Sequence, residues 1–196
     1  MFRSILMAAL VALLPQAVLA EAKTYALDND HTEIRFVWDH AGVSDQGGRW
    51  SSVEGTVSFD PKDLAATSVS VKIDPASINT GVPALDKHMK TSDMFDIEAF
   101  PDITFTSKGA VQTGNASARV TGDLTIKDAT LPMVLDVELV HMGEHPLGQF
   151  LDFYKGEWIG IRATGRLLRS AYGVGFGAPL TSDLIRVEIS SEMKAQ

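Results

Sequence analysis

The 196 residues include five histidines and no cysteine, so histidine is the side chain to consider first for metal binding or catalysis. A metal site needs several such ligands close together in space. His31 and His40 are nine residues apart, and an odd separation on a regular strand places them on opposite faces. His141 and His145 have helical spacing, but they lie among turn-forming residues with no third ligand nearby, and we interpret them as solvated loop histidines. We therefore expect no metal and no obligatory cofactor.

Catalysis by His40 or His88 would require a nucleophile or a carboxylate held against the imidazole ring. The sequence contains no G-x-S-x-G elbow and no P-loop, and Asp86 is near His88 only along the chain. The glycine run Gly173–Gly177 lies in a turn-rich segment, and we interpret it as a flexible turn rather than a phosphate cradle. The sequence therefore predicts no catalytic residue.

Arg169 opens a polar cluster, RSAYG, at the end of a segment with alternating apolar residues. A guanidinium group binds a carboxylate or a phosphate through two parallel hydrogen bonds. Arg169 could thus contact a ligand, or it could form a structural ion pair at a strand end. The spacing of the residues leaves both alternatives open.

The segment DNDHTEIRFVWDH, Asp28–His40, shows how such side chains would be positioned. Ile34, Phe36 and Trp38 are in phase with one another at a period of two, and His40 continues the same face. This pattern predicts a strand whose apolar face ends in an imidazole. That face would meet either a packed core or a cavity for an apolar ligand with a polar head group.

The same period of two recurs along most of the chain and predicts about eight strands. Strands joined in this way avoid open edges by closing into an antiparallel β-barrel, which has room for packed side chains or for one small ligand. Between Pro83 and Pro101 the alternation is lost, and one or two short helices are expected there, whereas residues 141–157 are expected to form a loop. The predicted strands are Thr32–Trp38, Val53–Phe59, Ser68–Ile73, Asp102–Ser107, Ser117–Lys127, Met133–Val140, Trp158–Leu168 and Leu184–Ser190.

Residues 1–20 have the pattern of a cleavable signal peptide, so we expect one exported, periplasmic domain over residues 21–196. Arg3 precedes the apolar run Ile5–Leu14, which is too short to span a bilayer, and Val18 and Ala20 suit a cleavage site. No later stretch is long and apolar enough to cross a membrane. The net charge of −8 becomes more negative without Arg3, which argues against binding to nucleic acid.

Six ordered motifs lie at Tyr25–His40, Gly48–Trp50, Ser77–Gly81, Asp86–Phe95, Phe100–Ser107 and Gly122–Lys127. In this order they resemble the YceI-like family of exported polyisoprenoid-binding proteins. The resemblance covers nearly all of the chain after residue 20 and implies a lipocalin-like barrel that holds an isoprenoid chain without an obligatory metal. The chain departs from the family pattern at Asp128, where a glycine is usual, and at Trp38 and Trp50, where smaller or phenylalanyl residues are common.

Together, pattern and resemblance predict a periplasmic carrier or store for an isoprenoid or quinone-like lipid. The alternatives are an enzyme that acts on a prenyl lipid, with His40 or His88 as base, and a stress-related periplasmic protein with a solid core; a homodimer is also left open. Ala163 and Gly165 are small residues on an inward face and would leave room for the lipid. The residues expected to bind it are Ile34, Phe36, Trp38, His40, Trp50, Val57, Phe59, Phe95, Phe105, Ile161, Ala163 and Arg169.

Overall fold

Strand β1 (Lys23–His40) carries the alternating segment and is longer than the predicted Thr32–Trp38. In the computed structural model, which describes residues 22–196, one edge of β1 pairs with β10 (Leu184–Ala195). Its other edge pairs first with β3 (Val53–Phe59) and then with β2 (Ser44–Trp50). The register shifts between Leu27 and Thr32, where the Asn29 side chain accepts a hydrogen bond from the Val53 N–H. At this irregularity the same edge of β1 changes its partner from β3 to β2. The predicted signal peptide lies outside the described residues.

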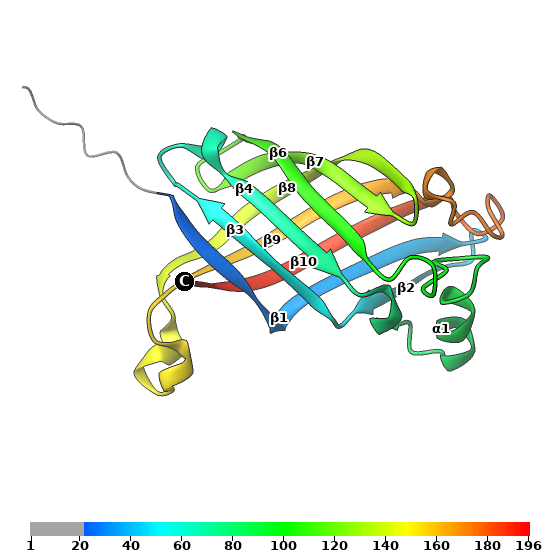
Figure 1. The fold of residues 1–196 in the computed structure, drawn as a ribbon, viewed down its shortest axis with the longest axis horizontal. Coiled ribbons are helices and arrows are strands. Elements are labelled where there is room, and N and C mark those ends of the chain that lie inside the picture. The colour runs from blue at the N-terminus through cyan, green and yellow to red at the C-terminus, as the bar shows by residue number, and fades with distance from the viewer. Residues whose placement is uncertain (1–21) are drawn as a thin grey trace, which may run out of the picture.

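Eight strands close into an antiparallel barrel, as the period of two predicted. Their order around the barrel is β1, β3, β4, β6, β7, β8, β9 and β10, and the last pairs with the first (Figure 1). Short β2 and β5 (Ile78–Asn79) extend the sheet beside the far end of β1. The remaining strands are β4 (Ser68–Ile73), β6 (Ile103–Gln112), β7 (Ser117–Ile126), β8 (Ala129–Glu144) and β9 (Glu157–Leu168).

One end of the barrel carries a helix, α1 (Pro83–Met89), in the segment where the alternation is lost. Pro83 occupies the first turn, where its missing N–H costs no hydrogen bond. The Asp86 carboxylate accepts hydrogen bonds from the Thr80 N–H and hydroxyl, at 2.7 and 2.6 Å. The helix is thereby tied to the segment that follows β5. We call this end of the barrel the α1 end.

The segment expected to be a loop over residues 141–157 is partly strand and partly helical, so that prediction was wrong. Strand β8 continues to Glu144, and two 3-10 turns follow at Pro146–Gln149 and Asp152–Tyr154. Residues 145–156, here called the outer strap, lie outside the barrel (Figure 1). They cover Trp158, whose outward-facing side chain is only 1% exposed.

The outer strap is held by aromatic and polar contacts that a sequence pattern does not reveal. The Trp158 indole N–H donates to the Tyr154 carbonyl at 3.0 Å, and the His145 ring stacks on the Tyr154 ring at a centroid distance of 4.3 Å. His145 Nε2 also lies 3.2 Å from the Glu192 carboxylate. Nε2 of His141 is buried with no hydrogen-bond partner among residues 22–196. These two histidines are therefore packed against the barrel rather than solvated.

Stability of the outer strap should depend on the charge of His31. Its Nδ1 lies 2.8 Å from the Asp28 carboxylate and its Nε2 lies 3.1 Å from the Tyr154 hydroxyl. The hydrogen bond with Asp28 is the main cause of a raised His31 pKa, above the usual 6.5. Because the folded pKa is the higher one, this contribution is complete below pH 6.5 and disappears as the pH rises through the folded value.

We expect His31→Gln to lower the melting temperature more at pH 5.5 than at pH 8. The side chain of His31 is 42% exposed, so the difference should be below about 1 kcal/mol. Thermal unfolding of both proteins over this pH range measures it. An equal deficit at every pH would show that the His31 charge does not contribute.

Candidate ligand-binding cavity

The barrel encloses a cavity of about 700 Å³, which is lined by side chains from all eight barrel strands. A volume of this size lies within the range of small-molecule sites in proteins. On β1 the even-numbered residues from Thr32 onward face the cavity, as the alternation predicted. All the residues expected to bind a ligand line it, namely Ile34, Phe36, Trp38, His40, Trp50, Val57, Phe59, Phe95, Phe105, Ile161, Ala163 and Arg169. Their contact with a ligand stays a prediction.

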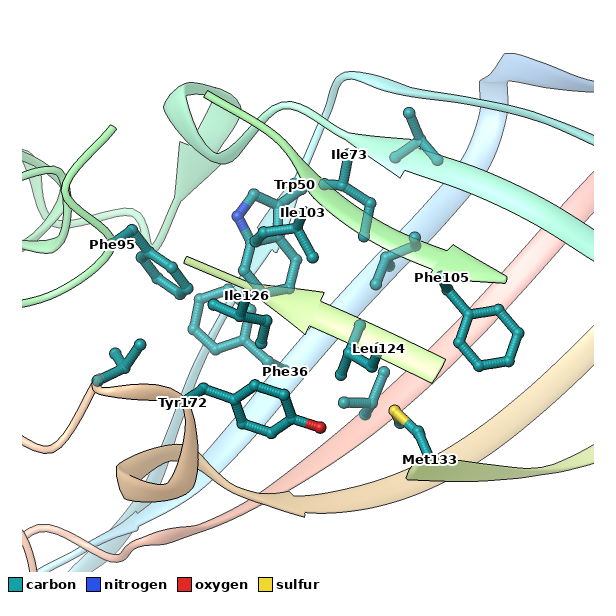
Figure 2. Packing of buried hydrophobic residues seen from close by; sticks show 14 of the residues in the cluster. Phe36, Trp50, Ile73, Phe95, Ile103, Phe105, Leu124, Ile126, Met133 and Tyr172 are labelled. Carbon is teal, nitrogen blue, oxygen red and sulfur yellow. The ribbon is translucent and has the colours of Figure 1, made fainter. Parts of the chain in front are cut away.

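Aromatic rings narrow the cavity at the α1 end (Figure 2). The Phe36 ring lies 4.6 Å from the Trp50 ring and 5.9 Å from the Trp38 ring, measured between centroids. The Phe95 ring contacts Trp50 edge-on at 5.8 Å. Both tryptophans that depart from the family pattern therefore face inward and occupy space that smaller residues would leave free.

Of the two small residues expected to leave room, only Ala163 lines the cavity. It is 2% exposed and belongs to β9, whose neighbouring inward residues are isoleucines. Gly165 is instead covered by other side chains, since an added Cβ would lie 2.6 Å from the Met133 methyl and 2.9 Å from Leu135. The expectation that Gly165 keeps space for a ligand was wrong, because Met133 already fills that space.

The two histidines considered as bases lie at the α1 end. His40 is exposed at the end of β1, where its backbone pairs with Thr181. The His88 ring packs edge-on against the Phe176 ring at 5.0 Å. The Asp86 carboxylate is engaged by Thr80, so the neighbouring Asp86 and His88 do not form an acid–base pair in this structure.

Within residues 22–196 Arg169 forms no ion pair, so that alternative was wrong, whereas its contact with a ligand stays a prediction. It is 8% exposed, and its three nitrogens donate five hydrogen bonds at 2.7–3.0 Å to oxygens of the loop that follows it. The acceptors are the carbonyls of Val174, Phe176, Thr181 and Ser182 and the hydroxyl of Thr181. Arg169 thus holds residues 174–182 across the α1 end. The glycine run belongs to this loop, and Gly173 adopts a left-handed turn with a φ of 71°.

Tyr172 is a cavity residue that the sequence analysis did not single out. It is 2% exposed and lies in a 3-10 turn, Arg169–Tyr172, directly after β9. Its ring faces the interior beside Phe36 and Leu124 (Figure 2). The RSAYG cluster contained it, but the alternation ends before the turn and gives no phase for its side chain.

Two further features concern possible cofactors and membrane contact. In the part of the chain that the structure describes, no group of three or more His, Cys, Asp or Glu side chains could hold a metal ion. None of the helices formed by residues 22–196 combines the length and the apolar character that a membrane span requires.

Comparison with protein families places most of the chain in one domain type. Residues 25–193 match the model of a YceI-like domain. A UPF0312 protein of Vibrio cholerae is 31% identical over 176 residues, which cover 89% of each chain. The protein YceI of Escherichia coli is 31% identical over 169 residues, covering 85% of this chain and 84% of that one.

Solved structures show the same barrel. BcnA of Burkholderia cenocepacia aligns with a TM-score of 0.73 and 23% identity, covering 85% of this chain and 98% of its own. A polyisoprenoid-binding domain from Saccharophagus degradans aligns with a TM-score of 0.62 and 15% identity, covering 90% of this chain and 100% of its own. At these identities the two alignments establish a shared fold.

Proposed function

Because this chain belongs to the YceI-like family, we propose that it binds an isoprenoid lipid in its barrel and carries or stores it in the periplasm. The observation that carries the proposal is the apolar cavity of about 700 Å³ inside a closed barrel. A solid core would leave no such volume. The Saccharophagus domain, described as polyisoprenoid-binding, has the same fold and supports this choice of ligand.

Burial of the hydrocarbon chain would supply most of the binding energy. Each methylene group moved from water into such a cavity contributes about 0.8 kcal/mol, so several isoprene units suffice without a charged contact. The walls that would receive the chain include Ile34, Phe105, Ile161 and Ala163. A carrier of this kind shields its ligand from water between two membranes.

We place the polar head of the ligand, a quinone-like ring or a prenyl phosphate, at the α1 end. This end combines the aromatic rings of Phe36 and Trp50 with His40 at the exposed rim. An imidazole there could hydrogen-bond a head group that hydrocarbon walls would leave unpaired. We propose no catalytic step, because the Asp86 carboxylate is engaged by Thr80 and, among residues 22–196, no hydrogen bond joins the ring of His40 or His88 to another side chain.

Native mass spectrometry of protein purified from its own periplasm, followed by organic extraction, tests the proposal. We expect a mass increment that disappears on extraction and an extract that contains an isoprenoid. Protein from which no lipid can be extracted, and which does not take up added isoprenoid, would contradict the carrier function. Conversion of an added prenyl lipid into a product would favour an enzyme instead.

Export should remove residues 1–20. The positive residue Arg3, the apolar run Ile5–Leu14 and the small residue Ala20 before Glu21 motivate this prediction. The intact mass of protein recovered from the periplasm should correspond to a chain that begins at Glu21. A chain that retains Met1, or one recovered only from the cytoplasm, would contradict both the signal peptide and the periplasmic location.

A further inference from the structure

Several polar groups in the cavity wall either have partners within the protein or, like the Trp50 indole N–H and the Thr67 hydroxyl, are buried without one. The buried hydroxyls of Thr32 and Ser191 hydrogen-bond each other at 2.7 Å. All five N–H groups of Arg169 donate to the loop at residues 174–182. The Trp50 indole N–H is fully buried beside the Phe95 ring, so it is closed off by packing. None of these groups is available to a ligand in this structure.

The Tyr172 hydroxyl differs from them. No hydrogen bond from another residue of the described chain reaches it, and burial is the influence that raises the pKa of its phenol. Figure 2 shows the hydroxyl oxygen directed from the 3-10 turn into the barrel interior, away from the loop that carries it. The ring belongs to the same buried apolar cluster as Phe36 and Leu124. A hydroxyl that faces an apolar cavity without a protein partner is free to donate to a ligand, and the hydrogen bond would stabilise the complex.

The turn that carries Tyr172 is firmly anchored. The Asp183 carboxylate accepts hydrogen bonds from the Ser170 N–H and hydroxyl, at 2.7 and 2.6 Å. The Arg169 N–H donates to the Asp183 carbonyl at 3.0 Å, and Gly173 closes the turn in the left-handed region. The phenol is therefore held in place before any ligand arrives, which reduces the entropy lost on binding.

We propose that the Tyr172 hydroxyl recognises the ligand by donating a hydrogen bond to an uncharged oxygen, such as a ring carbonyl or an ether. This inference rests on the proposed function and specifies its ligand class. A tyrosine phenol is protonated at neutral pH, and burial raises the pKa of Tyr172 further, so its hydroxyl can donate. Among the described residues that line the cavity, Arg169 is the sole lysine or arginine, and its donors are used. A phosphate carried as deep as Tyr172 would therefore find no lysine or arginine with a hydrogen-bond donor free to bind it.

The test compares Tyr172→Phe, which removes one oxygen atom, with Tyr154→Phe, which makes the same change on the outer strap. Three probes share one short prenyl chain: the hydrocarbon, the chain attached to a benzoquinone ring, and the chain attached to a phosphate. Their affinities are measured by displacement of a fluorescent apolar dye from the delipidated protein. Thermal unfolding confirms that each variant is folded.

We expect Tyr172→Phe to bind the quinone probe roughly three- to tenfold more weakly than the parent, as the loss of one hydrogen bond predicts. Its affinity for the hydrocarbon should be unchanged, and Tyr154→Phe should bind all three probes like the parent. Unchanged quinone affinity in Tyr172→Phe, or an equal loss for the hydrocarbon, would overturn the inference but leave lipid binding intact. The phosphate binding more tightly than the quinone would overturn the ligand class. Failure of the parent to bind any probe would instead overturn the proposed function, and the inference with it.

Discussion

An Ala163→Trp barrel should remain folded at nearly the stability of its parent and should bind no isoprenoid. Ala163 is 2% exposed and lines the cavity from β9, so an indole at this position can extend into open volume. It then takes the place of the lipid chain. The measurements are thermal unfolding of the delipidated protein and the lipid content of protein purified from the periplasm.

Gly122→Ala is the matched control for added volume in a packed part of the same barrel. A Cβ at Gly122 would lie 2.5 Å from both the Phe105 ring and the Thr106 carbonyl, and the carbonyl belongs to the backbone and moves with difficulty. We expect a loss of about 1–3 kcal/mol or more in the free energy of unfolding. If Ala163→Trp lost as much stability as Gly122→Ala, and the parent contained no lipid, the interior would be a solid core.

Arg169→Met should destabilise the protein by roughly 3–5 kcal/mol, since one substitution removes five hydrogen bonds and leaves one buried and three partly buried carbonyls without this donor. The loss should be concentrated in the loop at residues 174–182, because four of its carbonyls lose their donor. Urea denaturation measures the global effect. Hydrogen exchange of the loop amides, compared with those of β7, measures the local one.

Arg166→Met provides the control for this second prediction. Arg166 lies on β9, three residues before Arg169, and its side chain is exposed. Surface substitutions of this kind usually change stability by less than about 0.5 kcal/mol. Two results would show that the guanidinium does not hold the α1 end together. One is an equal free energy of unfolding for Arg169→Met and Arg166→Met, and the other is an unchanged hydrogen-exchange rate of the loop amides in Arg169→Met.

The barrel and most of its inner wall could be predicted because both depend on local order. A strand alternates its side chains whatever its neighbours are, so the phase of Ile34, Phe36 and Trp38 fixed the face that lines the cavity. By the same rule Trp158 lies on the outer face of β9, where a side chain is ordinarily exposed. It is buried because the outer strap folds back over it, and that contact depends on tertiary structure.

Other parts of the site depend on partners that alternation does not specify. Arg169 was recognised as a candidate, yet its acceptors are backbone carbonyls, which every residue possesses and which leave no mark in the sequence. Gly165 has the right phase for the cavity but is covered by Met133 from the adjacent strand. Tyr172 follows the end of β9, where the phase of the strand no longer applies. For all three residues, the contacts of the side chain depend on segments brought together only in the folded structure.

The pairing of β1 with β10 also determines when this barrel can form during folding. These strands lie side by side in Figure 1, although Tyr25 and its partner Ala195 stand at opposite ends of the described chain. Closure is therefore among the last events possible, because a chain that has not yet been synthesised through Leu184–Ala195 leaves the edges of β1 and β9 unpaired. Contacts of such long sequence separation form slowly, and open strand edges promote aggregation. Until its final strand is in place, the polypeptide should depend on chaperones to remain unaggregated.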